Sequence, residues 1–92
     1  MKYIKLPVQI LRQKGKYIAY TPALDLSTSG KTKRQALSRF NEIVDIFLEE
    51  IIESKTADRV LRDLGWEKID SGWQPPVIVS QQPIKFSMNA LA

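Results

Sequence analysis

Residues 17–50, YIAYTPALDLSTSGKTKRQALSRFNEIVDIFLEE, constrain the fold more than any other part of the chain. A β-rich run at 17–21 ends at Pro22, small polar residues follow at 27–30, and a long segment with helical periodicity comes directly afterwards. Strand, turn, strand and helix therefore follow one another with few residues between them. This order predicts a small sheet with one helix packed on it.

Apolar residues occupy every second position near the N-terminus: Ile4, Leu6, Val8 and Ile10. This is the period of a strand with one buried face, so we expect a strand over 4–10. Pro7 has no N–H to donate, which assigns this strand to the edge of the sheet. Gly15 lies in a short polar segment that predicts a turn, so the first strand and the run at 17–21 should form a hairpin.

A helix start signal follows Lys31. Thr32 can cap the helix with its hydroxyl, and Gln35 completes a capping box by bonding back to the Thr32 N–H. Apolar residues then recur at spacings of three and four over about five turns. They are Ala36, Leu37, Phe40, Ile43, Val44, Phe47, Leu48 and Ile51. The acids between them, Glu42, Asp45, Glu49 and Glu50, are expected on the solvated face.

A shorter helix capped by Thr56 and closed by Gly65 should follow, and a further strand should lie within 66–69. We therefore predict an α+β fold with a small antiparallel sheet, the element order β-β-β-α-α-β, and the long helix on one face. With 92 residues the chain has room for one such domain, at 1–73. Residues 74–92 form an extended C-terminal segment that can add a strand to a sheet edge or exchange one with a neighbour.

The composition excludes most enzyme chemistries. The chain has no Cys and no His, so it lacks disulfides, thiolate nucleophiles, imidazole bases and the commonest zinc ligands. The hydroxyls of Ser27, Ser29 and Ser38 have no histidine to activate them. We expect no catalytic residue, no metal site and no cofactor. A metal-dependent nuclease centred on Asp25 with carboxylates of the long helix is a remote alternative.

The length of the apolar runs argues against a membrane protein. No run approaches the length of a membrane span, and the N-terminus lacks the apolar core of a signal peptide. We expect a soluble, cytoplasmic protein without membrane contact.

Charge is distributed unevenly along the chain. Residues 1–34 hold eight Lys or Arg against the single acid Asp25, whereas the remainder holds six basic residues against nine acids. One end of the molecule should therefore carry positive potential. This favours an alternative function, binding of single-stranded RNA by a basic surface with one aromatic platform. The residues of this candidate surface are Lys14, Lys16, Tyr17, Lys31, Lys33 and Arg34.

Residues 17–50 also resemble the core of HicB-like antitoxin domains, in which a Tyr-x-Pro-x-Leu turn precedes a Ser/Gly strand and a Thr-capped helix. The shared positions are Tyr20, Pro22, Leu24, Ser29, Gly30, Thr32, Ala36, Ile43 and Leu48. The resemblance extends from residue 3 to about residue 70. It implies a partial, degenerate ribonuclease-H-like fold that binds and neutralises the small ribonuclease toxin HicA. Such domains form dimers or higher oligomers.

The same resemblance helps to define what this chain should not do. HicB antitoxins generally carry a C-terminal ribbon-helix-helix or helix-turn-helix module, but the segment after Trp73 is too short and too rich in Pro for either. We therefore expect a stand-alone domain without DNA binding. Ribonuclease-H chemistry needs several carboxylates around two metal ions, and the strand region offers only Asp25. We expect no nuclease activity.

The leading prediction is thus a non-catalytic protein-binding module, a HicB-like antitoxin or an orphan relative, that assembles as a homo-oligomer. Two segments are the expected interface. The first is the small third strand, which allows close approach of a partner, and the second is the apolar C-terminal segment. Their residues are Ser27, Thr28 and Ser29, and Ile84, Phe86 and Met88.

Overall fold

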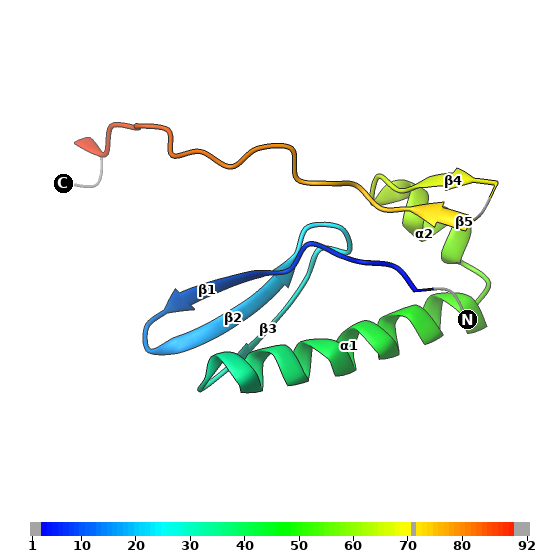
Figure 1. Ribbon diagram of the computed structural model, residues 1–92, viewed down its shortest axis with the longest axis horizontal. Helices are drawn as coiled ribbons and strands as arrows, with labels where there is room; N and C mark the ends of the chain where they lie inside the picture. Colours follow the sequence, from blue (N-terminus) through cyan, green and yellow to red (C-terminus); the bar gives the residue numbers. More distant parts are fainter. Residues whose placement is uncertain (1–2, 71, 90–92) are drawn as a thin grey trace.

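The structure, a computed structural model, describes residues 3–70 and 72–89. A three-stranded sheet comes first, followed by two helices and a short hairpin (Figure 1). The elements are β1 (Gln9–Gln13), β2 (Lys16–Thr21), β3 (Leu26–Gly30), α1 (Lys33–Glu53), α2 (Ala57–Asp63), β4 (Glu67–Ile69) and β5 (Gly72–Gln74). The predicted α+β class and the predicted element order are confirmed, and β5 is an additional strand that pairs with β4.

The main sheet is antiparallel with β2 in the centre. Ala19 of β2 lies opposite Ile10 of β1 and Thr28 of β3, and this row faces α1. Because side chains alternate across a strand, the row containing Leu11 and Ile18 faces the other way. The sheet therefore has one face covered by α1, and β1 and β3 are its edges.

The predicted strand over 4–10 is wrong in its position, because β1 begins only at Gln9. The register explains the difference. Gln9 pairs with Tyr20, so continued pairing would set Val8 opposite Thr21, the last residue of β2, and Pro7 opposite Pro22, beyond its end. Pro7 also has no N–H for a ladder. Residues 3–8 therefore continue from the sheet as an unpaired segment along α1.

The start of α1 agrees with the predicted cap in one bond and differs in the other. The Gln35 N–H donates to Thr32 Oγ1 at 3.0 Å, as in a capping box. The Gln35 Oε1 accepts from the N–H of Lys31 at 2.6 Å, one residue earlier than expected. Both bonds satisfy polar groups at the helix start and hold the turn that connects it to β3.

Close backbone approach between β3 and α1 explains the glycine at the end of this strand. A Cβ added to Gly30 would lie 2.5 Å from the backbone N of Ala36. Ala36 is itself buried with Phe40 and Ala19, so α1 begins directly on the sheet. The close approach that the sequence predicts at this strand is made, at Gly30, by the protein's own helix.

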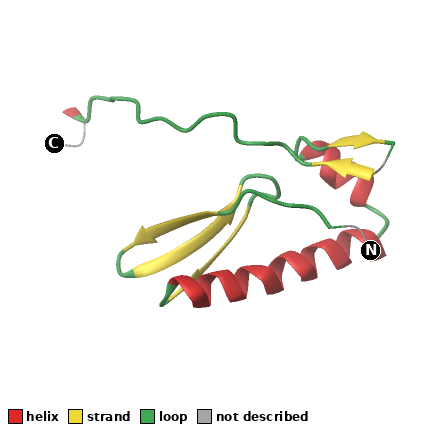
Figure 2. Ribbon diagram, in the orientation of Figure 1, coloured by secondary structure: helices red, strands yellow, loops and turns green. Residues whose placement is uncertain are grey.

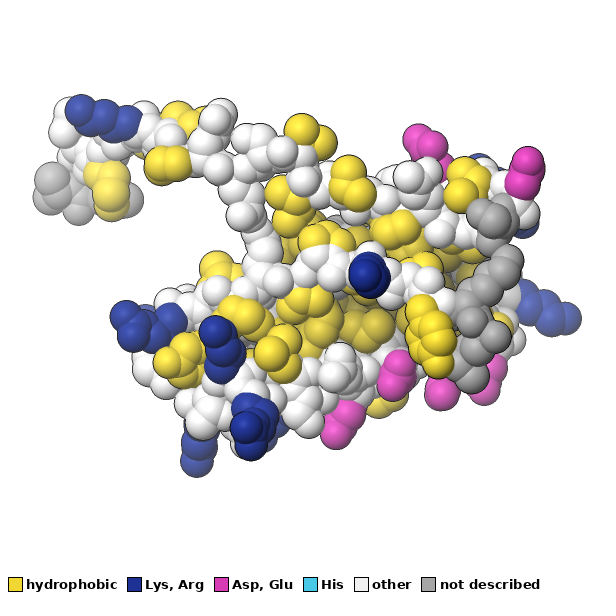
Figure 3. Space-filling model, in the orientation of Figure 1, with side chains coloured by type: hydrophobic (Ala, Val, Ile, Leu, Met, Phe, Trp, Pro, Cys, Tyr) yellow, Lys and Arg dark blue, Asp and Glu magenta, His cyan; other side chains and the backbone are white. Residues whose placement is uncertain are grey.

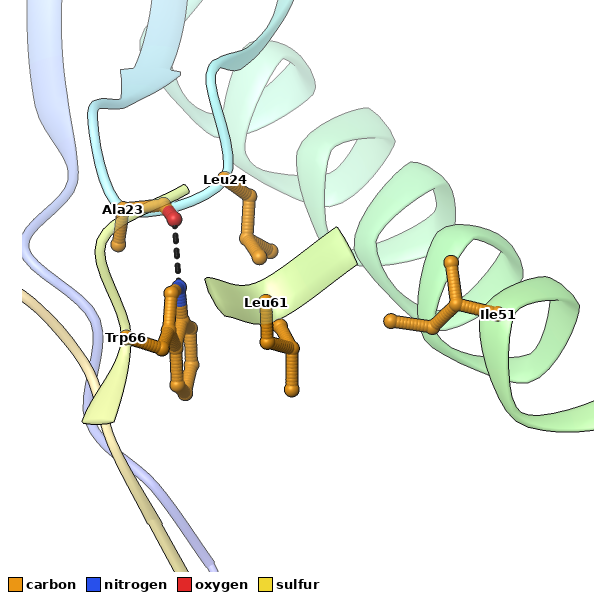
Figure 4. Packing of buried hydrophobic residues seen from close by; sticks show 5 residues of the cluster. All are labelled: Ala23, Leu24, Ile51, Leu61 and Trp66. Carbon is orange, nitrogen blue, oxygen red and sulfur yellow. Dashed lines mark hydrogen bonds between the residues drawn. The ribbon is translucent and has the colours of Figure 1, made fainter. Parts of the chain in front are cut away.

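A second group of buried residues joins the far end of α1 to α2 and the turn after β2 (Figure 4). It consists of Ala23, Leu24, Ile51, Leu61 and Trp66. The Trp66 Nε1 donates a hydrogen bond of 2.7 Å to the Ala23 carbonyl oxygen, so the one polar atom of the buried indole is satisfied. Gly65, at φ +93°, ends α2 and directs the chain back towards this turn.

Thr56 stands at the start of α2 as predicted, but its side chain makes no capping hydrogen bond, and its hydroxyl instead meets that of Ser54 at 2.7 Å. The chain then forms the β4–β5 hairpin, whose predicted turn includes Ser71, which lies outside the described residues. After Gln74 the described chain, residues 75–89, leaves the body as a long tail (Figures 1 and 2). Residues 84–88, which the alternation predicts as able to add a strand, form none within this chain.

Candidate protein-binding surfaces

The predicted interface residues of β3 divide between the two faces of the sheet. Ser27 and Ser29 lie opposite Tyr20 and Ile18, on the face away from α1, whereas Thr28 lies in the row that faces α1. The outer face also carries Leu11, whose side chain is 48% exposed. Two small hydroxyl residues beside exposed apolar surface leave room for another molecule, and their contact with a partner stays a prediction.

The tail, residues 75–89, carries the other predicted interface residues. All three are exposed, and Phe86 is the most exposed of them at 79%. Val77 and Val79 precede them and are exposed as well. The apolar residues of the tail are thus open to solvent in the single chain, which is unusual for side chains of this size.

Basic side chains gather at one end of the molecule, over the β1–β2 turn and the start of α1 (Figure 3). Lys16 and Lys31 line a small hollow of about 100 Å³ together with Arg39, whose Nη1 donates to the Ser29 carbonyl oxygen at 3.0 Å. Tyr17 and Lys33 line a second hollow of about 350 Å³ with Arg12. We call these residues, with the exposed Lys14 and Arg34, the basic end.

The structure therefore brings several of the predicted RNA-binding residues together, although in two hollows. Arg12 and Arg39 also line these hollows, although neither belongs to the six predicted residues. Arg39 lies four residues after Gln35, whose side chain contacts the backbone of Lys31. Because residues four apart share a helix face, this spacing could have indicated Arg39 from the sequence.

The outer surface of α1 is acidic along its second half. Helical periodicity places Glu42, Ile46, Glu49 and Glu53 in one row, and all four are exposed. We call this row the acidic face. Ile46 lies in the middle of it and is 61% exposed. The acids predicted on the solvated face are exposed, whereas the exposed isoleucine among them was not predicted.

These acids are not neutralised within the described part of the chain. The ion pairs that the described residues form are those of Asp58 with Arg62, at 2.7 Å, and with Lys68, at 3.7 Å. Glu49 and Glu53 are four residues apart on the same helix, a like-charge spacing that destabilises a helix. The acidic face therefore carries a repulsion that a basic partner would relieve.

The charges of α1 also run against the helix dipole. Its first turn contains Lys33 and Arg34 and no acid, and its last turn contains Glu50 and Glu53 and no basic residue. Negative charge is stabilising at the N-terminus of a helix and positive charge at the C-terminus. A sequence shaped for helix stability alone would show the reverse pattern.

An apolar groove of about 620 Å³ runs between α1 and the unpaired residues 3–8 (Figure 3). Ile4, Leu6 and Val8 line one side, and Val44 and Leu48 line the other. Asn41 and Asp45 provide polar atoms at its helix side. The predicted burial of the N-terminal apolar row is thus only partial, because Ile4 and Val8 stay exposed at the groove.

The described residues bring no three carboxylates together in an arrangement that could hold a metal ion. Asp25, the acid of the nuclease alternative, accepts a hydrogen bond from the Tyr20 hydroxyl at 3.1 Å. Desolvation by burial and this bond raise the pKa of the Tyr20 phenol. Asp25 thus has a local structural partner in the turn after β2.

Of the helices formed by residues 3–70 and 72–89, none has the length and apolar character needed to cross a bilayer. Comparison with known proteins finds no protein family model, no curated protein and no solved structure that matches this chain.

Proposed function

We propose that this protein is a non-catalytic protein-binding module of the cytoplasm, a HicB-like antitoxin or an orphan relative, that binds and neutralises a small basic ribonuclease. The observation that carries the proposal is the acidic face, in which Ile46 is exposed within a row of unneutralised glutamates. Charge of one sign steers an oppositely charged partner, and an exposed apolar residue at the centre provides the desolvated contact that holds it.

Two further features support the proposal. The resemblance of residues 17–50 to HicB-like domains supplies the type of partner, a ribonuclease whose substrate demands a basic surface. The charge pattern of α1 opposes the helix dipole, so the acids at its end reduce stability and are best explained by a binding role.

The experiment co-expresses the protein with a small basic ribonuclease of the HicA type taken from the reading frame that adjoins its gene. The wild type should restore growth, prevent RNA cleavage and co-purify with the ribonuclease. Ile46→Lys and Glu49→Lys should lose this protection. Glu67→Lys makes the same charge change as Glu49→Lys on the exposed strand β4, away from the acidic face, and should retain it. Equal loss in all three variants, or no protection by the wild type, would refute the proposal.

A second function, binding of single-stranded RNA, is favoured by the basic end, where the Tyr17 ring and Lys33 line one hollow and Lys16 and Lys31 line another. Counterion release would make such binding fall steeply with salt. Binding of a labelled single-stranded RNA should weaken at least tenfold between 50 and 200 mM salt, on the order expected for several phosphate contacts. Lys16→Glu and Lys31→Glu should abolish it, and Lys85→Glu in the tail should not.

A further inference from the structure

The apolar groove and the apolar residues of the tail are complementary in chemistry. The groove is open and is lined mostly by apolar side chains from residues 3–8 and α1. In the tail, Ile84, Phe86 and Met88 alternate with polar or charged residues, so an extended tail presents them on one side. Residues 3–8 precede the β1–β2 register, which begins at Gln9, so their backbone groups, apart from the missing N–H of Pro7, can pair with a neighbouring strand.

The first residues of the tail, Pro75 and Pro76, direct the tail away from the groove of its own chain. Pro75 and Pro76 are half-buried and line a hollow with Gly65 and Glu67. Two consecutive prolines hold a stiff, extended backbone, so the anchored pair sets the direction in which the chain leaves. Figure 1 shows the tail extending away from the β4–β5 hairpin without turning back to residues 3–8. Residues 77–89 thus reach outward, where a second molecule can meet them.

We propose that the tail of one copy occupies the apolar groove of a second copy, and that the exchange is reciprocal. Ile84, Phe86 and Met88 enter the groove beside Val44 and Leu48, and the tail backbone pairs with residues 3–8 of the second copy. This self-association uses a different surface from the acidic face, so it goes beyond the proposed function and leaves that face free for another protein.

Charge complementarity supports this occupant. Lys85 is the only charged residue of the described tail, and Asp45 is the charged residue that lines the groove. In an extended tail, Lys85 points away from the side that enters the groove, but its long, flexible side chain can bend back towards the exposed carboxylate of Asp45. Each copy contributes a tail and a groove, so a reciprocal exchange forms this contact twice, which helps it to reach the size of a stable interface, about 20–30 residues a side.

Disulfide trapping tests which molecule occupies the groove, and the absence of cysteine from the chain makes it unambiguous. Asn41→Cys places a thiol in the groove, and Met88→Cys places one on the side of the tail that enters it. Oxidation of an equal mixture of the two single variants should give a dimer with one chain of each. Glu50→Cys, on the opposite side of α1 from Asn41, should not cross-link to Met88→Cys. A variant that carries both cysteines in one chain completes the test. If its disulfide formed only within a single chain, the proposal would be overturned, because the tail would then occupy its own groove.

Self-association of the full chain, measured by light scattering during gel filtration and by sedimentation equilibrium, tests the contacts. Phe86→Asp should weaken it about 50-fold or more, as expected for removal of a buried aromatic ring, and Ser80→Asp should have little effect. Asp45→Lys and Lys85→Asp should each weaken it about threefold to tenfold, and the double exchange should restore it. Glu50→Lys controls for the change in net charge. A monomeric wild type, or equal effects of Phe86→Asp and Ser80→Asp, would refute the exchange.

Discussion

The Trp66 indole donates its Nε1 hydrogen to the carbonyl oxygen of Ala23, a bond of 2.7 Å that joins two positions 43 residues apart (Figure 4). Through this bond the chain that follows α2 is tied to the turn after β2. The contact closes the end of the core at which the sheet, α1 and α2 meet. It also fixes where the β4–β5 hairpin, and with it the root of the tail, leaves the body.

Replacing Trp66 by Phe should lower the free energy of unfolding by about 1–3 kcal/mol, because the Ala23 carbonyl would lose its partner in a buried place. Urea denaturation followed by circular dichroism measures the change. Trp73→Phe is the matched control, since Trp73 is half-buried and lies at 5.4 Å from the Arg62 guanidinium. A loss at Trp73 as large as that at Trp66 would contradict the role assigned to the bond.

Gly30→Ala should destabilise the protein by about 1–3 kcal/mol, the typical cost of overpacking. Its Cβ would lie 2.5 Å from the Ala36 backbone N, which belongs to the first turn of α1 and has little freedom to move. Thermal unfolding measures the effect, with Ser27→Ala on the exposed part of the same strand as control. An unchanged melting temperature would show that α1 does not approach β3 as closely as described.

Lys33→Glu and Arg34→Glu should each stabilise the protein by about 0.3–1 kcal/mol at low ionic strength, since they replace positive by negative charge at the N-terminus of α1. The gain should shrink in high salt, which screens exposed charges. Lys85→Glu makes the same change in net charge outside any helix. If it stabilised the protein as much, general charge repulsion and not the helix dipole would be the cause. Reduced RNA binding by the two helix variants would link the basic end to that alternative function.

The Asp58 carboxylate should contribute to the fall in the free energy of unfolding at low pH. The hydrogen bond from Arg62 Nε, at 2.7 Å, lowers the pKa of Asp58 below its ordinary value, and the positive charges of Arg62 and Lys68 act in the same direction. A carboxyl whose pKa is lower in the folded state stabilises the fold above its unfolded pKa of 3.8, and the contribution is lost as the pH falls through the folded value.

Asp58→Asn should therefore reduce stability at neutral pH and flatten its decline below about pH 4. Denaturant unfolding at a series of pH values measures the slope. Asp63→Asn, in the same helix, is the control because Asp63 forms no ion pair with a described residue. If the free energy of unfolding fell equally steeply with decreasing pH in the wild type and in Asp58→Asn, the role given to the Asp58 carboxylate would be wrong.

Local signals in the sequence predicted much of the fold. The cap at Thr32, the apolar row from Ala36 to Ile51 and the glycine at 65 are short-range patterns, and each element that they predict is present. The first strand was placed wrongly because alternation alone does not say which residues find a partner. The length of β2 and the position of its hairpin turn decide that, through the register.

Composition and periodicity alone thus determined the α+β class, the order of the elements, the two helix starts and the separation of basic from acidic residues along the chain. Tertiary structure decided what each surface exposes. It left residues 3–8 unpaired beside an apolar groove, used Gly30 for the approach of α1, and placed Ile46 in the open among glutamates. The physical reason is that exposure and pairing depend on contacts between distant segments, whereas caps and periodicity arise between residues a few positions apart.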